Sequence, residues 1–168
     1  GRKEVIELLL AKGLKLDARM TDGASPLHRA CENGHLAAAE LLIAKGADPA
    51  AADKAGLTPL HLAARNGHRD VAALLIDKGA DIKAPDYNSR PPLNYASTKK
   101  VVEILVKAGA EANAAAMPPL LDAAIHGFPE TVEALLDHGA DIQATDYTHY
   151  SPLHFAAWGG NARVVKIL

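Results

Sequence analysis

The sequence predicts an all-α solenoid in which short helix–turn–helix units stack on one another. The first observation is a fixed period, because Pro26, Pro59 and Pro92 follow one another at intervals of 33 residues, and the same interval separates Pro119 from Pro152. A period of this length is typical of repeat arrays. The second observation is that each unit holds two apolar helical segments that are too short to be stable alone. Each unit must therefore bury its apolar side on a neighbouring copy.

The most regular unit, residues 53–85, predicts both of its helices in detail. Thr58 is expected to cap the first helix, and Pro59 suits the first helical position, where a missing N–H costs nothing. The first helix is expected to end near Gly67 and the second near Gly79, because glycine readily adopts the positive φ found at helix ends. This unit therefore serves as the template for the others.

Four motifs of this unit are specific in their positions. They are Thr58-Pro59-Leu60-His61 followed by Ala63-Ala64, Gly67-His68, Leu74-Leu75, and Gly79-Ala80-Asp81. With these motifs the unit resembles the ankyrin repeat. The resemblance implies two antiparallel helices and a projecting β-hairpin finger per repeat, stacked into a curved solenoid. It also implies protein–protein binding on the concave face, which the fingers and the inner helices form.

The template extends over the whole chain, which predicts a single ankyrin repeat domain at 1–168. Its expected parts are a partial repeat at 1–21, repeats at 22–52, 53–85, 86–115 and 116–145, and a partial repeat at 146–168. Both outer units are cut within a repeat, so we expect the chain to be part of a longer array or a larger protein. Apolar surface is expected at the two ends, from Val5, Leu8 and Leu9 and from Val164, Val165 and Leu168.

The third unit departs from the template. Pro91 and Asn94 stand where the template has Thr58 and His61, and three residues of the turn between the helices are expected to be missing. The finger that follows, at 112–117, is also short. The two deletions predict a notch in the row of fingers, which is either a recess for a partner side chain or a change tolerated in a loop.

Composition narrows the classes of function. The chain has 168 residues and a formal net charge of −2, so no overall attraction to nucleic acid or to an anionic membrane is expected. No apolar run approaches the ~20 residues of a membrane span. The single cysteine, Cys31, stands at a small core position, which favours a reducing, intracellular (cytoplasmic) setting.

The eight histidines do not predict a metal or catalytic site. His28, His61 and His154 follow Pro-Leu, and the resemblance implies that such histidines bond to backbone and join finger to helix. No His-x-x-x-His or Cys-x-x-Cys spacing occurs, and no nucleophile or phosphate-binding motif is present. The sequence therefore predicts no enzyme activity, no catalytic residues, no metal and no cofactor.

The resemblance also places candidate contact residues, at the finger tips and at the two positions after Ala-Ala. Those in the first unit are Thr21, Asp22, Ala24, Glu32 and Asn33. Those in the later units are Lys54, Leu57, Arg65, Asn66, Tyr87, Asn88, Arg90, Met117, Ile125, His126, Tyr147, Thr148, Tyr150 and Trp158.

Four of the seven aromatic residues fall on these positions: Tyr87, Tyr147, Tyr150 and Trp158. Exposed Tyr, Trp and Arg are favoured anchors of interfaces, which predicts a binding region on the C-terminal half of the concave face. The alternative is that Tyr87 and Tyr147 pack on neighbouring fingers. The predicted function is a non-catalytic protein–protein interaction module. The other hypothesis is a structural, spring-like segment that positions other domains of a larger receptor, channel or enzyme.

Overall fold

A computed structural model describes residues 7–8, 12–13, 15–113 and 117–168. The regular structure in these ranges is helical throughout, and no strand occurs in them. The elements are α2 (Pro26–Glu32), α3 (Leu36–Ala44), α4 (Pro59–Arg65), α5 (Arg69–Asp77), the 3₁₀ helix η1 (Pro92–Tyr95), α6 (Lys99–Lys107), α7 (Pro119–His126), α8 (Pro129–Asp137), α9 (Pro152–Trp158) and α10 (Ala162–Ile167).

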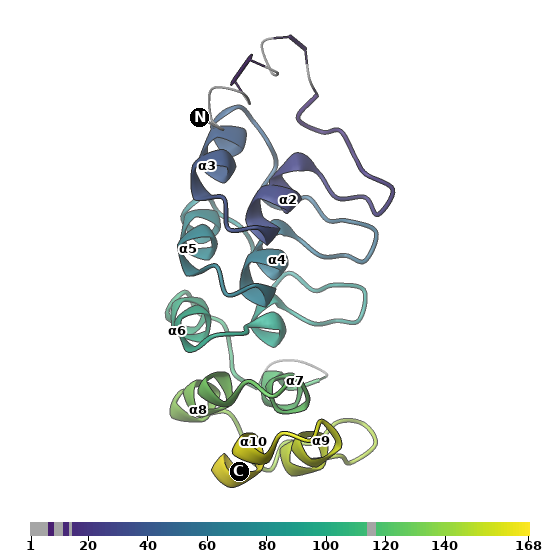
Figure 1. Ribbon diagram of the computed structural model, residues 1–168, viewed down its shortest axis with the longest axis vertical. Helices are drawn as coiled ribbons and strands as arrows, with labels where there is room; N and C mark the ends of the chain where they lie inside the picture. The colour runs from purple at the N-terminus through teal and green to yellow at the C-terminus, as the bar shows by residue number, and fades with distance from the viewer. Residues whose placement is uncertain (1–6, 9–11, 14, 114–116) are drawn as a thin grey trace.

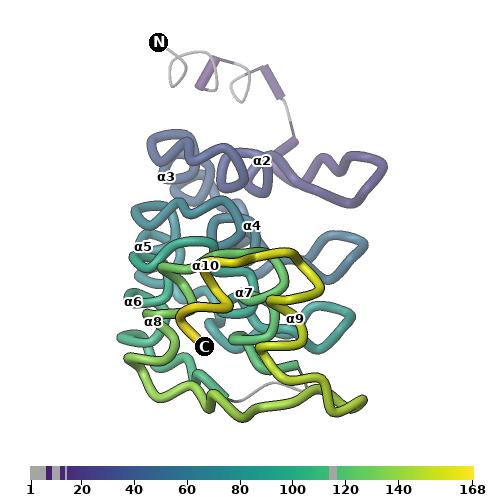
Figure 2. The backbone as a smooth tube through the Cα atoms, turned by 60° about the horizontal axis from the view of Figure 1, so that its bottom comes forward, coloured from purple at the N-terminus to yellow at the C-terminus, as the bar shows by residue number. Residues whose placement is uncertain are grey.

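The helices form two parallel rows, as the sequence predicted (Figure 1). The inner row runs α2, α4, η1, α7 and α9, and the outer row runs α3, α5, α6, α8 and α10, with each helix packed on the next one in its row. Loops project from the side of the inner row and lie roughly one above another (Figure 2). The arrangement is an all-α repeat solenoid with one continuous core.

Local sequence explains where the inner helices begin. Ser25, Thr58 and Ser151 each cap an inner helix whose first residue is proline, and each shares a reciprocal capping box with the histidine three residues later. Gly67 and Gly79 have φ of 73° and 82°, so they follow the helices in the left-handed region that glycine tolerates. The predicted capping and helix-ending positions are confirmed.

The core is a ladder of aliphatic side chains, one layer per repeat. Leu27, Leu60 and Leu93 occupy one repeat position and are fully buried. Cys31 is buried as expected, and burial raises the pKa of its thiol to about 12.

The expectations for the chain ends hold only in part. Leu8 and Val165 are exposed, and Leu168 is partly buried against the core. Val164 was expected to be exposed and is instead buried, because α10 packs on both α8 and α9. Val5 and Leu9 lie outside the described residues.

The third repeat corrects the expected position of its deletion. The sequence analysis placed the missing three residues in the turn between the helices. In the structure they are missing from the end of the inner helix and the start of that turn. The inner element is the four-residue η1, and Thr98 already occupies the position before α6 that His68 occupies before α5. Repeat three therefore has no counterpart of Ala64, Arg65 and Asn66.

The expected β-hairpin fingers are tight hairpin loops, without strands in the described ranges. Each is closed by a backbone bond between its first amide and its last carbonyl, as in Asp53 N to Leu57 O at 3.0 Å. We call these loops the fingers; they are residues 20–24, 53–57, 86–90 and 146–150. Residues 114–116 of the shortened finger lie outside the described residues, so the expected notch in the finger row remains a prediction.

Candidate functional site

The finger tips are built around an aspartate that holds its own loop. Asp53 Oδ1 accepts hydrogen bonds from the amides of Ala55 and Leu57, at 2.8 and 2.9 Å. Asp86 and Asp146 do the same in their fingers. Because two amides are fixed by one carboxylate, each tip presents its side chains from a defined backbone.

Buried histidines hold two of the fingers, residues 53–57 and 86–90, to the preceding repeat. His28 Nε2 contacts the Leu57 carbonyl and His61 Nε2 contacts the Arg90 carbonyl, both at 3.1 Å. A carbonyl only accepts, so Nε2 carries the proton and Nδ1 is left to accept from the capping residue. Burial lowers the pKa of both imidazoles, which keeps them neutral. The expected structural role of these histidines is confirmed.

Neighbouring fingers in the first half of the chain also bond to each other. Lys54 N donates to the Asp22 carbonyl at 2.9 Å, and Tyr87 N donates to the Ala55 carbonyl at 3.1 Å. The turn residue of the preceding finger, Gly56 in the finger at 53–57, must then be small. A Cβ on Gly56 would lie 2.7 Å from Tyr87 N, closer than real side chains approach.

Oppositely charged side chains follow one another along the inner row. Arg29 pairs with Asp22 and with Glu32, the latter at 2.6 Å. Glu32 then reaches across to Arg65 on the next repeat, at 3.1 Å. The chain of pairs ends at Arg65, because repeat three lacks the residue that would come next.

A recess lies where that residue is missing, between α4, η1 and α7. It has a volume of about 300 Å³. Its lining residues are Arg65, Arg90, Asn94, Tyr95, Asp122, His126 and Phe128. We call this hollow the recess; it opens on the inner face, which we define as the surface formed by the finger tips and the inner helices.

In repeat three, Asn94 makes the bond to a backbone carbonyl that a histidine makes in the preceding repeat. Its side-chain Nδ2 donates to the Met117 carbonyl at 2.7 Å, the bond that His61 makes to Arg90 one repeat earlier. The same nitrogen contacts Asp122 Oδ2 at 2.6 Å. Asp122 is buried, and burial raises the pKa of its carboxyl despite Asn94 and the nearby Arg90 guanidinium at 3.5 Å.

Tyr95 joins the recess to the neighbouring finger. Its hydroxyl donates to Asp86 Oδ2 at 2.5 Å. Burial and this bond raise the pKa of Tyr95 to about 12. Burial alone would raise the pKa of Asp86, but the bonds from Tyr95 and from two finger amides outweigh it, so the pKa of Asp86 lies below its ordinary value.

The far wall of the recess is a stacked ring pair. His126 and Phe128 lie 5.8 Å apart at an interplanar angle of 14°. His126 Nδ1 contacts the Asp122 carbonyl at 2.8 Å, so Nδ1 carries the proton. Phe128 stands at the position where the template has His68, a residue that bonds to backbone one repeat earlier.

Exposed aromatic side chains lie on the fingers at 86–90 and 146–150 and at the end of α9. Tyr147 is 91% exposed, Tyr87 76% and Trp158 73%. Tyr150 contacts Phe155 and Trp158 at ring distances of 6.0 and 6.4 Å. Tyr150, Phe155 and Trp158 form one cluster on the last finger and α9, whereas Tyr87 lies on the finger at 86–90.

The remaining predicted contact residues differ in burial. Leu57 is buried. Its carbonyl accepts a hydrogen bond from His28, and its amide donates one to Asp53. Met117 and Ile125 are partly buried against the core. Ala24 is also buried, and Glu32 and Arg90 are half-buried. The exposed ones are Thr21, Asp22, Asn33, Lys54, Arg65, Asn66, Asn88, His126 and Thr148.

Sequence reasoning missed four residues of the recess: Asn94, Tyr95, Asp122 and Phe128. A signal was present, because the third residue after the repeat proline changes from Leu62 to Tyr95 and then to Asp122, and the histidine before it changes as well. A carboxylate at a position that is apolar or aromatic in three of the other four repeats points to a specific partner, since buried charge is costly when unpaired.

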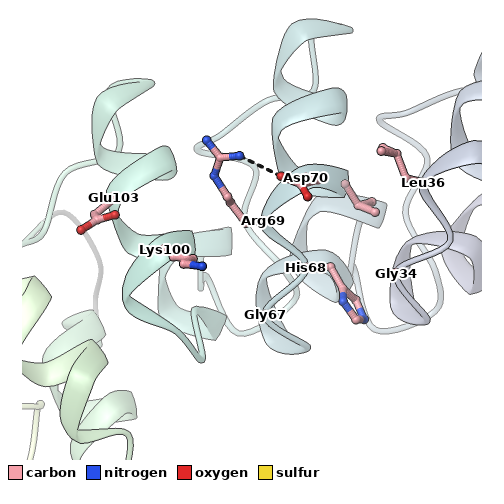
Figure 3. Close-up of a pocket in the computed structure, with 9 residues that line it drawn as sticks. Gly34, Leu36, Gly67, His68, Arg69, Asp70, Lys100 and Glu103 are labelled. Atoms are coloured by element: carbon pink, nitrogen blue, oxygen red, sulfur yellow. Dashed lines mark hydrogen bonds and ion pairs between the residues drawn. The ribbon is translucent and has the colours of Figure 1, made fainter.

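A second hollow, of about 660 Å³, crosses the starts of the outer helices α5 and α6 (Figure 3). Arg69 and Asp70 pair with each other there at 2.8 Å, and Lys100 and Glu103 come from α6. These four charges cancel. The groove therefore offers no set of converging groups comparable with the recess.

Two further observations concern the described residues alone. No group of three or more His, Cys, Asp or Glu side chains among them could hold a metal ion. Within the same ranges no helix is long and apolar enough to cross a membrane.

The stacked helix pairs, the histidine-held fingers and the open inner face define a helical repeat scaffold. The family described as ankyrin repeats (many copies) matches residues 1–43, 27–76 and 120–168, which together make up more than half of the chain. The chain therefore belongs to the ankyrin repeat family, whose members are generally protein–protein interaction modules and typically non-catalytic. No curated protein matches the chain significantly.

Proposed function

We propose that this chain is a non-catalytic module that binds a partner protein on its inner face, the concave face of the sequence analysis. The observation that carries the proposal is the exposure of Tyr87, Tyr147 and Trp158 on finger tips and at the end of an inner helix. None of these rings is required by the repeat template. Large exposed aromatic side chains on a fixed backbone are the groups that contribute most to protein interfaces.

The backbone beneath these rings supports the same conclusion. Asp86 and Asp146 each fix two amides of their finger, so Tyr87 and Tyr147 project from ordered loops. A side chain presented this way loses little further freedom on binding, which leaves more of its contact energy for affinity. Tyr87 also lies over Gly56 of the neighbouring finger, so packing and binding are compatible at this residue.

The chemistry of the chain favours a protein partner over nucleic acid. The formal net charge is −2, and the basic residues of the inner row are paired with Asp22 and Glu32. Binding to a phosphate backbone would require unpaired positive charge along the surface. A structural segment that only positions other domains would have no need of the exposed rings.

The test is a comparison of proteins captured from lysate of the source organism by three forms of the chain. They are the wild type, a Tyr87→Ala/Tyr147→Ala/Trp158→Ala variant, and a matched outer-face variant, Arg69→Ala/Asp70→Ala/Glu103→Ala. We expect at least one partner to be recovered about tenfold less by the aromatic variant and equally by the outer-face variant. Equal recovery by all three forms would refute binding through the inner face and favour the structural alternative.

A further inference from the structure

We propose that the recess accepts one carboxylate side chain, Asp or Glu, of the partner protein, held between Arg65 and Arg90. This inference rests on the proposed function and adds the chemistry of one contact. The recess exists because repeat three lacks the counterpart of Arg65, so the row of inner-helix side chains is interrupted. A partner side chain would occupy the place of that missing residue.

Both guanidinium groups border the hollow and remain accessible. The side chain of Arg65 is 44% exposed and that of Arg90 is 31% exposed. Arg65 is anchored from outside the recess, where one of its nitrogens contacts Glu32 at 3.1 Å. A guanidinium has five N–H donors in a planar fork, so this contact leaves donors for a carboxylate in a two-point arrangement.

The carboxylate of Asp122, which lines the recess, is covered and already bonded to its neighbours. Asp122 is 5% exposed, and both its oxygens are engaged, Oδ2 by Asn94 at 2.6 Å and Oδ1 by Arg90 at 3.5 Å. Among the residues that line the recess, the charged groups that reach solvent are the guanidinium groups of Arg65 and Arg90. Glu32 already pairs with Arg65 and Asp122 with Arg90, so the recess offers a partner carboxylate the guanidinium N–H donors that these pairs leave over, not an excess of positive charge.

The walls and the volume suit a single acidic side chain. Tyr95, Phe128 and the His126 ring supply apolar surface for the methylene groups, and His126 Nδ1 is already committed to a carbonyl. The volume of about 300 Å³ corresponds to roughly ten waters at ~30 Å³ each. That space admits one side chain with a few waters, and it excludes a helix or a second finger.

The test uses short peptides and does not require the partner. The ¹⁵N-labelled chain is titrated with acetyl-Gly-Glu-Gly-amide and with its glutamine counterpart, and the Nε–Hε signals of the arginines are followed by NMR. We expect saturable shifts of the Arg65 and Arg90 signals with the glutamate peptide and none with the glutamine peptide. Arg65→Gln should weaken the binding about tenfold, the loss expected for a hydrogen bond to a charged group.

Two variants complete the design. Arg69→Gln removes a comparably exposed arginine on the outer face and should leave the affinity unchanged. Arg90→Gln should weaken binding as Arg65→Gln does. If the Arg90 variant proves less stable than the wild type, the Arg65 variant alone decides the test. Equal shifts with both peptides, or a stronger response to a lysine peptide, would overturn the proposal. Either result would leave the capture experiment on the aromatic residues untouched, so the two proposals fail separately.

Discussion

Residues 22–85 and residues 86–145 follow the same two-helix plan, but their repeats are joined differently. In the first region a buried histidine holds each following finger, and the fingers bond to each other through Lys54 N and Tyr87 N. In the second region Asn94 replaces the histidine, and the inner helix is reduced to η1. The core continues through both regions, since Leu60 and Leu93 are equally buried.

The comparison separates what the solenoid requires from what it tolerates. A donor to the carbonyl before the next inner helix is present in both regions, from His61 in one and Asn94 in the other. The last turn of the inner helix is not required, and its loss opens the recess. A deletion that leaves the core intact can therefore create a new surface feature on the binding side.

The largest expected effect lies in the second region. Asn94→Leu keeps the approximate volume but removes both bonds of the amide, leaving the buried Asp122 carboxylate with Arg90 alone at 3.5 Å. We expect the free energy of unfolding to fall by about 3 kcal/mol, because the buried carboxylate loses a hydrogen-bond donor and the Met117 carbonyl loses its partner. Urea unfolding followed by circular dichroism measures it.

The control for this variant is Asn94→Leu/Asp122→Leu. Replacing both partners by apolar groups removes the uncompensated charge, so the double variant should regain at least half of the lost stability. A double variant as unstable as the single one would show that the Met117 bond, and not the carboxylate, accounts for the loss.

The next largest effect is expected in the first region, at Gly56. Gly56→Ala places a Cβ 2.7 Å from Tyr87 N and forces alanine to a φ of 82°. Strain and the displaced finger together should lower the free energy of unfolding by about 2 kcal/mol. Gly79→Ala is the matched control, since its φ is also 82° but no atom lies within 4 Å of the added Cβ. Equal losses in the two variants would argue that the fingers do not pack as described.

The two regions should also respond differently to acid. Burial lowers the pKa of His61 below its ordinary 6.5, so the unfolded chain binds a proton there that the folded chain does not. The stability that neutral His61 contributes is present above pH 6.5 and is lost as the pH falls below it, at no more than ~1.4 kcal/mol per pH unit. His61→Asn, which copies position 94, should reduce the pH dependence between pH 7.5 and 5. An unchanged dependence would mean that His61 is protonated in the fold.

The sequence was sufficient for the features that repeat. The period, the caps at Ser25 and Thr58 and the buried Cys31 follow from motifs that recur at fixed spacing, and the histidine contacts were implied by the resemblance to the ankyrin repeat. The recess could not be predicted in the same way. It depends on Asn94 and Asp122, which lie 28 residues apart on different repeats and whose bond does not follow from any motif that recurs along the chain.

The smallest expected effect concerns the turn position of the third finger. Ser89 has a φ of 61° where the two preceding fingers have Gly23 and Gly56 with φ of 84° and 82°. Glycine adopts this conformation without the strain that a side chain causes, but it also makes the unfolded chain more flexible. Ser89→Gly should therefore raise the free energy of unfolding by only about 0.5 kcal/mol. Because Gly56→Ala is expected to be strongly destabilising at the equivalent position, the pair tests whether stacking between fingers, and not the turn alone, requires glycine. A large loss of stability in Ser89→Gly would show that the serine side chain makes contacts of its own.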